Sequence, residues 1–403
     1  MSAVDADSLD DVFDVQELAF GYRAGKARRE ADRKLIDPAR VIASRDRGAI
    51  VGVAEWMPAR MTLPGRAVEP VAAVSGVAVR PTHRRQGRLR AMMRRQLDAL
   101  NAGAQHSAVL VASEPMIYQR FGYGPATLGS RYTVEKRGLQ VETRSKSTGR
   151  IELVSADEAR RTFPGLLERA QAERAGEVFR WDFQWDYLLG RYDDGTKSEP
   201  YFVRYVDGEV LGGYGIYRIE ADPTGGFDRS IRLVELCAPT PAAYLGLWSY
   251  LVSIDLVPKI ETGWRPVDEP IRWDLSDYRA MRCERTCERT FVRLIDVAEA
   301  LARRRYQPKG SLVLAVRDPF CPWNEGGYRI EAGEEGEAAI SRTGVAGSDL
   351  ALDVSTLGSL YLGGLSASVL ARAGLVEELS LGALEKADRL FGVSAPPFCS
   401  VSF

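Results

Sequence analysis

The sequence comprises 403 residues, enough for two or three domains that each bury a core. Hydrophobic residues make up 45% and charged residues 27%, and the formal net charge of −1 provides no global field that would attract nucleic acid or an anionic membrane. The acidic N-terminus lacks a signal-peptide pattern and no apolar run could span a bilayer. Cys283 and Cys287 are close in sequence, but the other three cysteines are scattered and there are only two histidines, which argues against a zinc site. We therefore expect a cytoplasmic protein with reduced cysteines and no metal.

The first part of the chain predicts helices followed by an antiparallel meander. Apolar positions in 10–22 indicate a helix, and the charged segment 23–33 indicates a solvated helix or loop. Turn residues separate apolar, β-branched runs, so strands are expected at 41–43, 49–59 and 68–79.

The last of these strands leads into a basic loop and a helix. After Pro81 comes Arg84-Arg85-Gln86-Gly87-Arg88-Leu89, and Leu89 begins an apolar face that continues to Leu100. The first N–H groups of a helix have no intrahelical partner, and glycine lets a phosphate approach the backbone closely. The spacing is neither a Walker loop nor a dinucleotide fingerprint, so the segment predicts a site for a small polyanion.

A second motif follows the next predicted strand, 108–112. Here Tyr118, Gly122 and Tyr123 give the pattern Tyr-x-x-x-Gly-Tyr within the run IYQRFGYGPAT. An aromatic residue beside glycine is often a packing residue, which is the alternative for both tyrosines.

Together these motifs resemble the GCN5-related N-acetyltransferases. Arg84 and Gly87 fit the acetyl-CoA pyrophosphate loop, Arg/Gln-x-x-Gly-x-Gly/Ala, whereas Leu89 departs from its last position. The run IYQRFGYGPAT, with the C-terminal Phe403, resembles the Eis acetyltransferases in particular. A basic surface helix after a buried strand remains the plainer alternative for the loop.

The middle of the chain predicts a second unit with a similar element order. Ser155 and Glu158 form a capping box before a helix, and 201–219 reads as a hairpin. A strand is expected at 231–237, a helix at 241–253 and a strand at 256–261. In place of the basic loop stands Ala238-Pro239-Thr240-Pro241-Ala242, in which proline removes N–H donors. We interpret this unit as a degenerate acetyltransferase fold, with an unrelated α+β domain as the alternative; the polar segment 131–147 is expected to lead between domains.

The remainder predicts a third, α+β unit. A strand is expected at 291–294, and Asp296 is expected to cap a helix that ends at Arg305. Further strands are expected at 311–316, 328–331, 338–341 and 350–352, and helical segments at 360–362, 367–373 and 383–390. The run LAVRDPFCPWNEG resembles the sterol-carrier-like domain of the Eis family, although a carrier-like shape does not imply lipid carriage.

The predicted fold class is α+β (mixed α/β), with tandem GCN5-related acetyltransferase folds followed by a sterol-carrier-like domain. The predicted domains are 1–145, 146–288 and 289–403. The resemblance implies acetyl-CoA as co-substrate, bound by the following residues: Val77, Ala78, Val79, Arg84, Arg85, Gln86, Gly87, Arg88, Leu89, Arg90, Ser113 and Glu114.

The resemblance also implies the groups that move protons. Tyr118 is the predicted general acid, because a phenol of pKa about 10 can protonate a departing thiolate. The α-carboxylate of Phe403 is the predicted general base, although an unperturbed α-carboxyl, with pKa about 3.5, is a weak base for an ammonium. In the family an acidic residue often precedes the final Phe, where this chain has Ser402.

We therefore expect an acetyl-CoA-dependent N-acetyltransferase that acts on aminoglycoside-like polyamines, at several positions, as a homohexamer. The expected partners include neither nucleic acid nor membrane. The alternatives are acetylation of protein lysines or other small amines, and a non-catalytic acyl-CoA- or lipid-binding protein.

Overall fold

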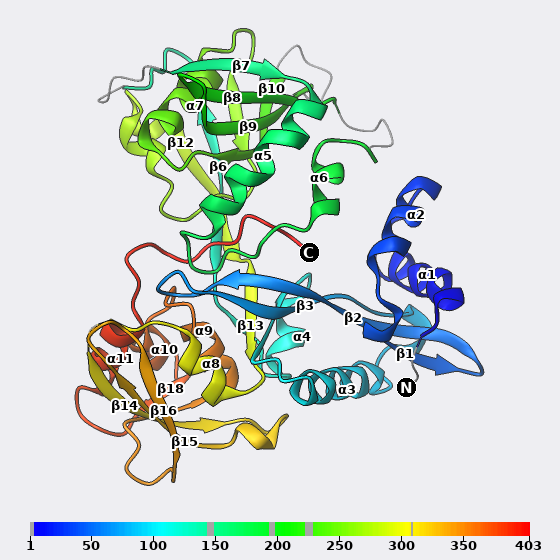
Figure 1. The fold of residues 1–403 in the computed structure, drawn as a ribbon, viewed down its shortest axis with the longest axis vertical. Coiled ribbons are helices and arrows are strands. Elements are labelled where there is room, and N and C mark those ends of the chain that lie inside the picture. Colours follow the sequence, from blue (N-terminus) through cyan, green and yellow to red (C-terminus); the bar gives the residue numbers. More distant parts are fainter. Residues whose placement is uncertain (1–3, 143–148, 193–197, 222–228, 308) are drawn as a thin grey trace. The chain divides into compact units, whose positions relative to one another are not determined.

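A computed structural model of the protein describes residues 4–142, 149–192, 198–221, 229–307 and 309–403 (Figure 1). The chain forms two compact units. The first comprises 1–127, 174–178 and 288–403, and the second comprises 128–173 and 179–287. The predicted domain boundary after residue 145 lies outside the described residues.

The N-terminal part of the first unit is a six-stranded sheet with helices on both faces (Figure 1). Its strands, in spatial order, are β1 (Val41–Asp46), β2 (Ala49–Thr62), β3 (Val68–Val79), β4 (Ser107–Val111), β13 (Thr290–Leu294) and β5 (Gly124–Pro125). Its helices are α1 (Leu9–Phe20), α2 (Lys26–Leu35), α3 (Arg88–Ala102) and α4 (Pro115–Gln119). The predicted helix–meander–helix–strand order is confirmed.

Alternation along β2 places α1 and α3 on opposite faces of this sheet. Val53 packs with α1, whereas the next residue, Ala54, packs with Met92 of α3. Successive strand side chains point to opposite faces, so the two helices cover different sides.

Strand β13 completes the first sheet from a distant part of the sequence. It pairs antiparallel with β4, from Thr290↔Val111 to Leu294↔Ser107, and with β5 on its other side. The sequence analysis placed this strand at the start of the third domain. Its pairing depends on long-range register, which a local apolar run does not reveal.

The C-terminal part of the first unit contains a five-stranded sheet and short helices. In spatial order the strands are β16 (Ala338–Thr343), β15 (Gly326–Ala332), β14 (Gly310–Arg317), β17 (Leu350–Asp353) and β18 (Val376–Glu378). The helices are α8 (Val297–Arg303), α9 (Val354–Leu360), α10 (Ala367–Arg372) and α11 (Ala383–Phe391). Asp296 caps α8 as predicted, by accepting a bond from the Glu299 N–H. The sequence analysis missed β18.

The second unit is built on a seven-stranded sheet. In spatial order the strands are β12 (Met281–Glu288), β6 (Leu128–Glu135), β11 (Lys259–Thr262), β10 (Arg229–Cys237), β9 (Val210–Ala221), β8 (Tyr201–Asp207) and β7 (Arg150–Val154). Its helices are α5 (Ala156–Gln171), α6 (Asp182–Leu188) and α7 (Pro241–Ser253). The hairpin and the Ser155 cap are confirmed. The interpretation of 131–147 as a polar lead between domains is wrong over 131–135, because these residues belong to β6.

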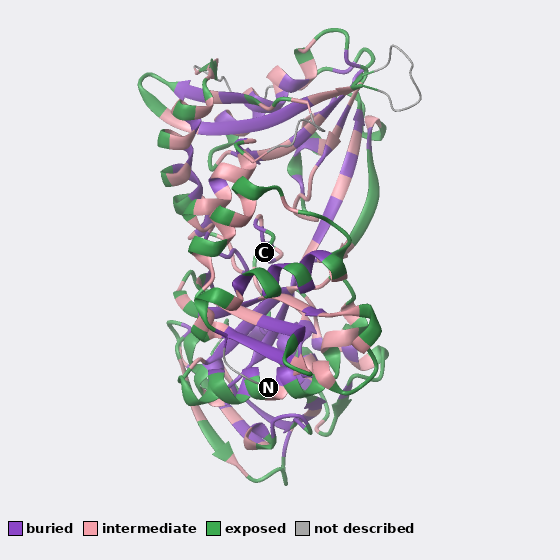
Figure 2. Cartoon of the chain, turned by 90° about the vertical axis from the view of Figure 1, so that its right-hand side faces the viewer, coloured by how far each residue is buried: buried purple, intermediate pink, exposed green. Residues whose placement is uncertain are grey.

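Short 3-10 helices lie at Ala6–Ser8, Pro38–Arg40, Pro81–His83, Pro270–Asp274, Tyr278–Ala280 and Pro322–Asn324. Buried residues follow the strands and the inner sides of the helices in each unit (Figure 2).

Candidate active site

The candidate site begins where β3 and β4 part. These parallel strands pair only at Ala72↔Ala108 and Ala73↔Val109. Beyond Ala73, β3 continues for six residues to Val79 and pairs only with β2 on its other side. The edge of β3 that faces the divergence therefore has no strand partner at Val77 and Val79, and it can offer backbone groups to a ligand.

A β-bulge lies in this free part of β3. Val53 pairs with Ala78 and Glu55 pairs with Ser75, so Gly76 and Val77 together oppose the single residue Ala54. Gly76 has a φ of +59°, and a Cβ there would lie 2.5 Å from Oε1 of Glu55. The positive φ favours glycine here, and a Cβ would displace the flexible side-chain ends of Gln16 and Glu55. The bulge changes the direction of the backbone beside the divergence.

The basic loop after β3 forms an anion-binding backbone. Arg85 and Gly87 both have left-handed backbones, with φ of 61° and 76°. Helix α3 begins directly afterwards, and no side chain caps its first turn. Successive N–H groups in such a turn point to one side and favour an anion, as does the positive end of the helix dipole. This geometry supports the predicted pyrophosphate site.

The side chains around the loop differ in exposure and in their partners. Arg84 is exposed and donates from Nε to the Val79 carbonyl at 3.3 Å. Arg88 is directed towards β1, where it donates to Oγ of Ser44 at 3.0 Å and pairs with Asp46 at 3.7 Å. Arg88 thus braces the loop. Arg85, Gln86, Gly87 and Arg90 are exposed, whereas Leu89 packs against the sheet.

Tyr118 lies on the far side of the divergence, after β4. Ser113 and Glu114 are exposed at the end of β4, and Tyr118 follows in the short helix α4. Tyr118 packs on the same apolar core as Val77 and Leu89. Burial, and secondarily the charge of Glu114, raises the pKa of Tyr118 to about 12. The phenol is therefore protonated at neutral pH.

Tyr123 is a packing residue. Its side chain is fully buried, and its hydroxyl has no hydrogen-bond partner. Burial is the main cause that raises the pKa of its phenol. Its ring meets that of Tyr118 edge-on, with centroids 6.0 Å apart. Tyr123 therefore packs against Tyr118 and supports its position.

A loop of the C-terminal part, 318–324, packs against the residues that follow Tyr118. The ring of Phe320 meets that of Phe121 edge-on at 5.0 Å, and the guanidinium of Arg94 lies 4.0 Å from the Phe320 ring centroid. Gly122 has a φ of +85°, and a Cβ there would lie 2.7 Å from Cζ of Arg293. The sequence analysis noted this loop only as a family resemblance and missed its contacts with the site.

The C-terminal tail is attached within the same unit. The Phe398 N–H donates to the Ala175 carbonyl at 3.0 Å, and Ser400 donates from N and Oγ to Glu177. Ser402 accepts a bond from Arg289 at 2.5 Å, and Phe403 is half-buried. The tail is thus held by specific polar contacts almost to its last residue.

Glu55 is a candidate that the sequence analysis missed. It projects beside the bulge, and burial raises the pKa of its carboxyl to about 7. Its Oε2 atom is buried and has no hydrogen-bond partner. A signal was present in the sequence, since Glu55 is the one charged residue in the otherwise apolar run 49–59.

The second unit repeats the architecture without the anion site. Strands β10 and β11 are parallel, and β10 carries a register shift between Leu233 and Glu235. Helix α7, however, is capped by Thr240, whose side chain accepts from the Ala243 N–H, and it has proline in its first turn. Its first donors are already engaged or absent, which supports the degenerate interpretation.

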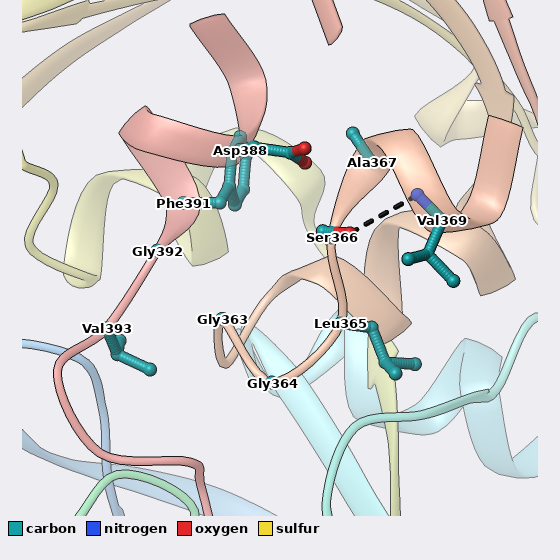
Figure 3. A pocket seen from close by; sticks show the side chains of 10 residues that line it. All are labelled: Gly363, Gly364, Leu365, Ser366, Ala367, Val369, Asp388, Phe391, Gly392 and Val393. Carbon is teal, nitrogen blue, oxygen red and sulfur yellow. Dashed lines mark hydrogen bonds between the residues drawn. The ribbon is translucent and has the colours of Figure 1, made fainter. Parts of the chain in front are cut away.

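A separate cavity lies in the C-terminal part. It has a volume of about 300 Å³ and is formed by the segments around α10 and the end of α11 (Figure 3). Its lining combines glycines with the carboxylate of Asp388 and the ring of Phe391. This is at the small end of ligand pockets, and a carboxylate in the wall disfavours an apolar lipid.

Over 4–142, 149–192, 198–221, 229–307 and 309–403, no group of three or more His, Cys, Asp or Glu side chains could hold a metal ion. None of the helices described there has the length and apolar character needed to cross a membrane. The cysteines Cys237, Cys283, Cys287, Cys321 and Cys399 are free thiols.

Comparison with known proteins places this geometry in a family context. Residues 1–126 and 176–294 each match an acetyltransferase (GNAT) domain, and residues 297–400 match a sterol carrier protein domain. An uncharacterized N-acetyltransferase of Streptomyces avermitilis is 36% identical over 388 residues, covering 93% of this chain and 91% of that protein.

The N-acetyltransferase Eis of Mycobacterium tuberculosis is 33% identical over 356 residues, covering 86% of this chain and 84% of that protein. The crystal structure of Eis1 from Mycobacterium abscessus superposes with a TM-score of 0.87 at 33% identity, over 99% of this chain and 98% of that one.

Proposed function

Since the chain belongs to the Eis family of N-acetyltransferases, with acetyl-CoA as the co-substrate that its GNAT domains imply, we propose that it acetylates the amines of aminoglycoside-like polyamines, at several positions. One observation carries the proposal. The loop before α3 has left-handed residues and leads into a helix start without a side-chain cap, and it lies with the protonated phenol of Tyr118 beside the diverging strands β3 and β4.

Acetyl-CoA would lie along the free edge of β3. The pyrophosphate binds the N–H groups from Arg85 to Arg90, with the exposed Arg84 beside it. The pantetheine amides pair with the backbone of Val77, Ala78 and Val79, and an N–H beside the bulge polarises the thioester carbonyl. Ser113 and Glu114 line the same channel from β4.

Tyr118 supplies the proton for the departing thiolate. The pKa of about 12 keeps the phenol protonated, but it makes proton transfer to a thiolate costlier than from an ordinary phenol. A developing thiolate next to the hydroxyl accepts a hydrogen bond before the proton moves, which stabilises the transition state directly.

The α-carboxylate of Phe403 is proposed to act at the acceptor amine. The polar contacts of Phe398, Ser400 and Ser402 fix the end of the chain, so the carboxylate has little conformational freedom to lose when it binds a cation. Ser402 is uncharged and its hydroxyl accepts a hydrogen bond from Arg289, so this residue provides no second anion for the acceptor.

The proposed assembly is a homohexamer in the cytosol. Size-exclusion chromatography with light scattering tests the assembly, and a mass below six subunits at working concentration contradicts it.

Thiol release with acetyl-CoA and a panel of aminoglycosides, lysine-containing peptides and simple amines tests the proposed acceptor. We expect release with aminoglycosides, and more than one acetyl group per molecule by mass spectrometry. Removal of Phe403 should abolish release while acetyl-CoA binding and thermal stability persist. Release only with peptides would replace the aminoglycoside acceptor with protein lysines, and release unaffected by the truncation would remove the carboxylate from the mechanism.

A further inference from the structure

We propose that Glu55 forms a second anionic subsite for the acceptor, in which its carboxylate binds the acceptor's ammonium group and takes the proton that must leave before the amine attacks. The inference rests on the proposed acetyl transfer to cationic amines and adds a residue to that site.

The register of the sheet places Glu55 beside the reacting centre. Glu55 pairs directly with Ser75, the residue just before the bulge, and its Oε1 lies next to Gly76. Alternation along β2 places its side chain on the face covered by α1, opposite α3. The Glu55–Ser75 pair is therefore directly next to the bulge, whose backbone is proposed to hold the thioester. The carboxylate lies on the sheet face opposite helix α3.

Both strands become less buried at this point. Residues 50–54 of β2 and 71–74 of β3 are buried, whereas Glu55, Trp56 and Met57 and their neighbours Ser75, Gly76 and Val77 are half-buried. This change occurs in both strands at the same register. Glu55 therefore lies at a register where both strands are less covered than at the residues before them in β2 and β3.

The carboxylate has no cation to balance it. Within the described chain no lysine or arginine forms an ion pair with Glu55, and its Oε2 has no hydrogen-bond partner. From α1 it meets the amide of Gln16, a hydrogen-bond donor that favours the carboxylate. The negative charge of Asp32, on α2, repels the charged form of Glu55 and so raises the pKa of its carboxyl.

The remaining titratable groups nearby do not supply a positive charge to it. Tyr22, after α1, is a phenol whose pKa is raised mainly by burial and in small part by Glu55. Arg28 lies 5.2 Å from the centroid of the Tyr22 ring and pairs with Asp32 at 3.6 Å. An unbalanced, half-buried carboxylate is costly by itself, and a cationic ligand removes that cost.

The proton steps balance as follows. The acceptor ammonium gives one proton to the Glu55 carboxylate, and the free amine then attacks the thioester carbon, forming the C–N bond. The C–S bond breaks, and the thiolate takes the Tyr118 proton. The Tyr118 phenoxide takes the second proton from the acylated nitrogen, which restores the phenol, and Glu55 releases its proton to solvent. The net reaction releases one proton for each acetyl group transferred.

The raised pKa suits this task. A carboxyl that titrates near pH 7 is a far better proton acceptor at neutral pH than an ordinary carboxylate, and general bases work best when their pKa lies near the operating pH. The same group is still ionised in part at pH 7, so it can attract the ammonium first.

The test is the pH dependence of kcat/KM for wild type and Glu55→Gln, with acetyl-CoA saturating and with whichever amine the wild-type enzyme acetylates. We expect Glu55→Gln to lower kcat/KM by about 10²- to 10⁴-fold and to remove an ionisation near pH 7, while acetyl-CoA binding is unchanged. Glu152→Gln, the same change at a half-buried glutamate of the second unit, should leave the profile as in wild type.

Two further variants keep Glu55 and shift its ionisation in opposite directions. Gln16→Leu removes a group that lowers the pKa of Glu55, so the acidic limb of the kcat/KM profile, where activity rises with pH, should move to higher pH. Asp32→Asn removes a charge that raises it, so the limb should move to lower pH. Titration of the acceptor amine or of Phe403 would follow neither change.

The outcomes separate this inference from the proposed acceptor. If aminoglycosides are acetylated but Glu55→Gln keeps the wild-type rate and profile, Glu55 is a structural residue and the proposed acceptor stands. If only other amines are acetylated and the Glu55→Gln profile is flattened, the acceptor proposal fails and the Glu55 subsite stands. Acidic limbs that stay in place in both Gln16→Leu and Asp32→Asn overturn the subsite even if Glu55→Gln does not fold.

Discussion

Arg293 and Asp318 form an ion pair of 2.7 Å with side-chain exposures of only 0% and 1%. Arg293 belongs to β13 in the first sheet, and Asp318 begins the loop that follows β14 in the C-terminal sheet. Asp318 also accepts bonds from the Cys321 N–H at 3.0 Å and from Asn324 at 2.9 Å. The pair therefore joins the sterol-carrier-like part to the strand that abuts Gly122.

Breaking this pair should destabilise the first unit. Asp318→Asn leaves a buried guanidinium without its counter-charge, which costs about 3–5 kcal/mol in comparable pairs. Denaturant unfolding measures the loss, and the matched control is Asp353→Asn. Asp353 pairs with Arg317 at 2.9 Å, but both side chains are more than half exposed, so that change should cost no more than about 1 kcal/mol. Equal losses for the two variants would contradict a structural role for the buried pair.

Replacement of the two tyrosines should separate chemistry from packing. Tyr118→Phe removes the proposed proton donor, so kcat should fall by about 10²- to 10⁴-fold with little change in acetyl-CoA affinity. Tyr123→Phe removes a buried hydroxyl that has no partner, so stability should be unchanged or slightly higher and kcat should change little. Steady-state kinetics and isothermal titration with acetyl-CoA make the comparison.

The pH profile provides a second test of Tyr118. Its pKa is raised to about 12, so the acid form persists where an ordinary phenol would be half ionised. The wild-type kcat should therefore show no alkaline decline attributable to the phenol up to pH 10. A decline near pH 10 that disappears in Tyr118→Phe would show that the phenol titrates normally.

Local patterns predicted the elements that are proposed to bind the cofactor, because each of these elements is defined by residues close together in the sequence. Each pattern spans a short stretch of sequence: the apolar face that ends at Leu100, the turn at Gly87 and the Tyr118 motif. In the structure, the helix begins without a side-chain cap and lies beside diverging strands. The rest depends on distant pairing. The contact of Arg293 with Gly122 and the position of Glu55 beside a bulge follow from the register between separate segments, which no short window contains.

Stability should depend on the ionisation of Glu55. Its pKa is 4.5 in an ordinary setting and about 7 in the folded protein, so the folded state binds more protons than the unfolded state between these values. Stability should therefore decrease as pH rises from 4.5 to 7, by at most about 3 kcal/mol from this group. Glu55→Gln should match wild type near pH 4.5 and exceed it at pH 8. Parallel stability curves for the two proteins between pH 4.5 and 8 would show that the carboxyl ionises freely.

The loop backbone at Gly87 should be required for acetyl-CoA binding more than for folding. Gly87 has a φ of +76° and open space around its Cβ position, so alanine there is strained by the backbone alone. A left-handed alanine costs roughly 1–2 kcal/mol, which the loop can relieve by changing the direction of its N–H groups. Gly87→Ala should therefore raise the KM for acetyl-CoA, by about tenfold if 1.4 kcal/mol of binding energy is lost.

The control for that experiment lies in the second unit. Gly208, in the turn between β8 and β9, has a φ of +59° and the same open surroundings. Gly208→Ala should cause a similar loss of thermal stability with no change in the KM for acetyl-CoA. A KM that rises equally in both variants would indicate a global effect of glycine replacement, whereas a rise confined to Gly87→Ala assigns the pyrophosphate to the loop before α3.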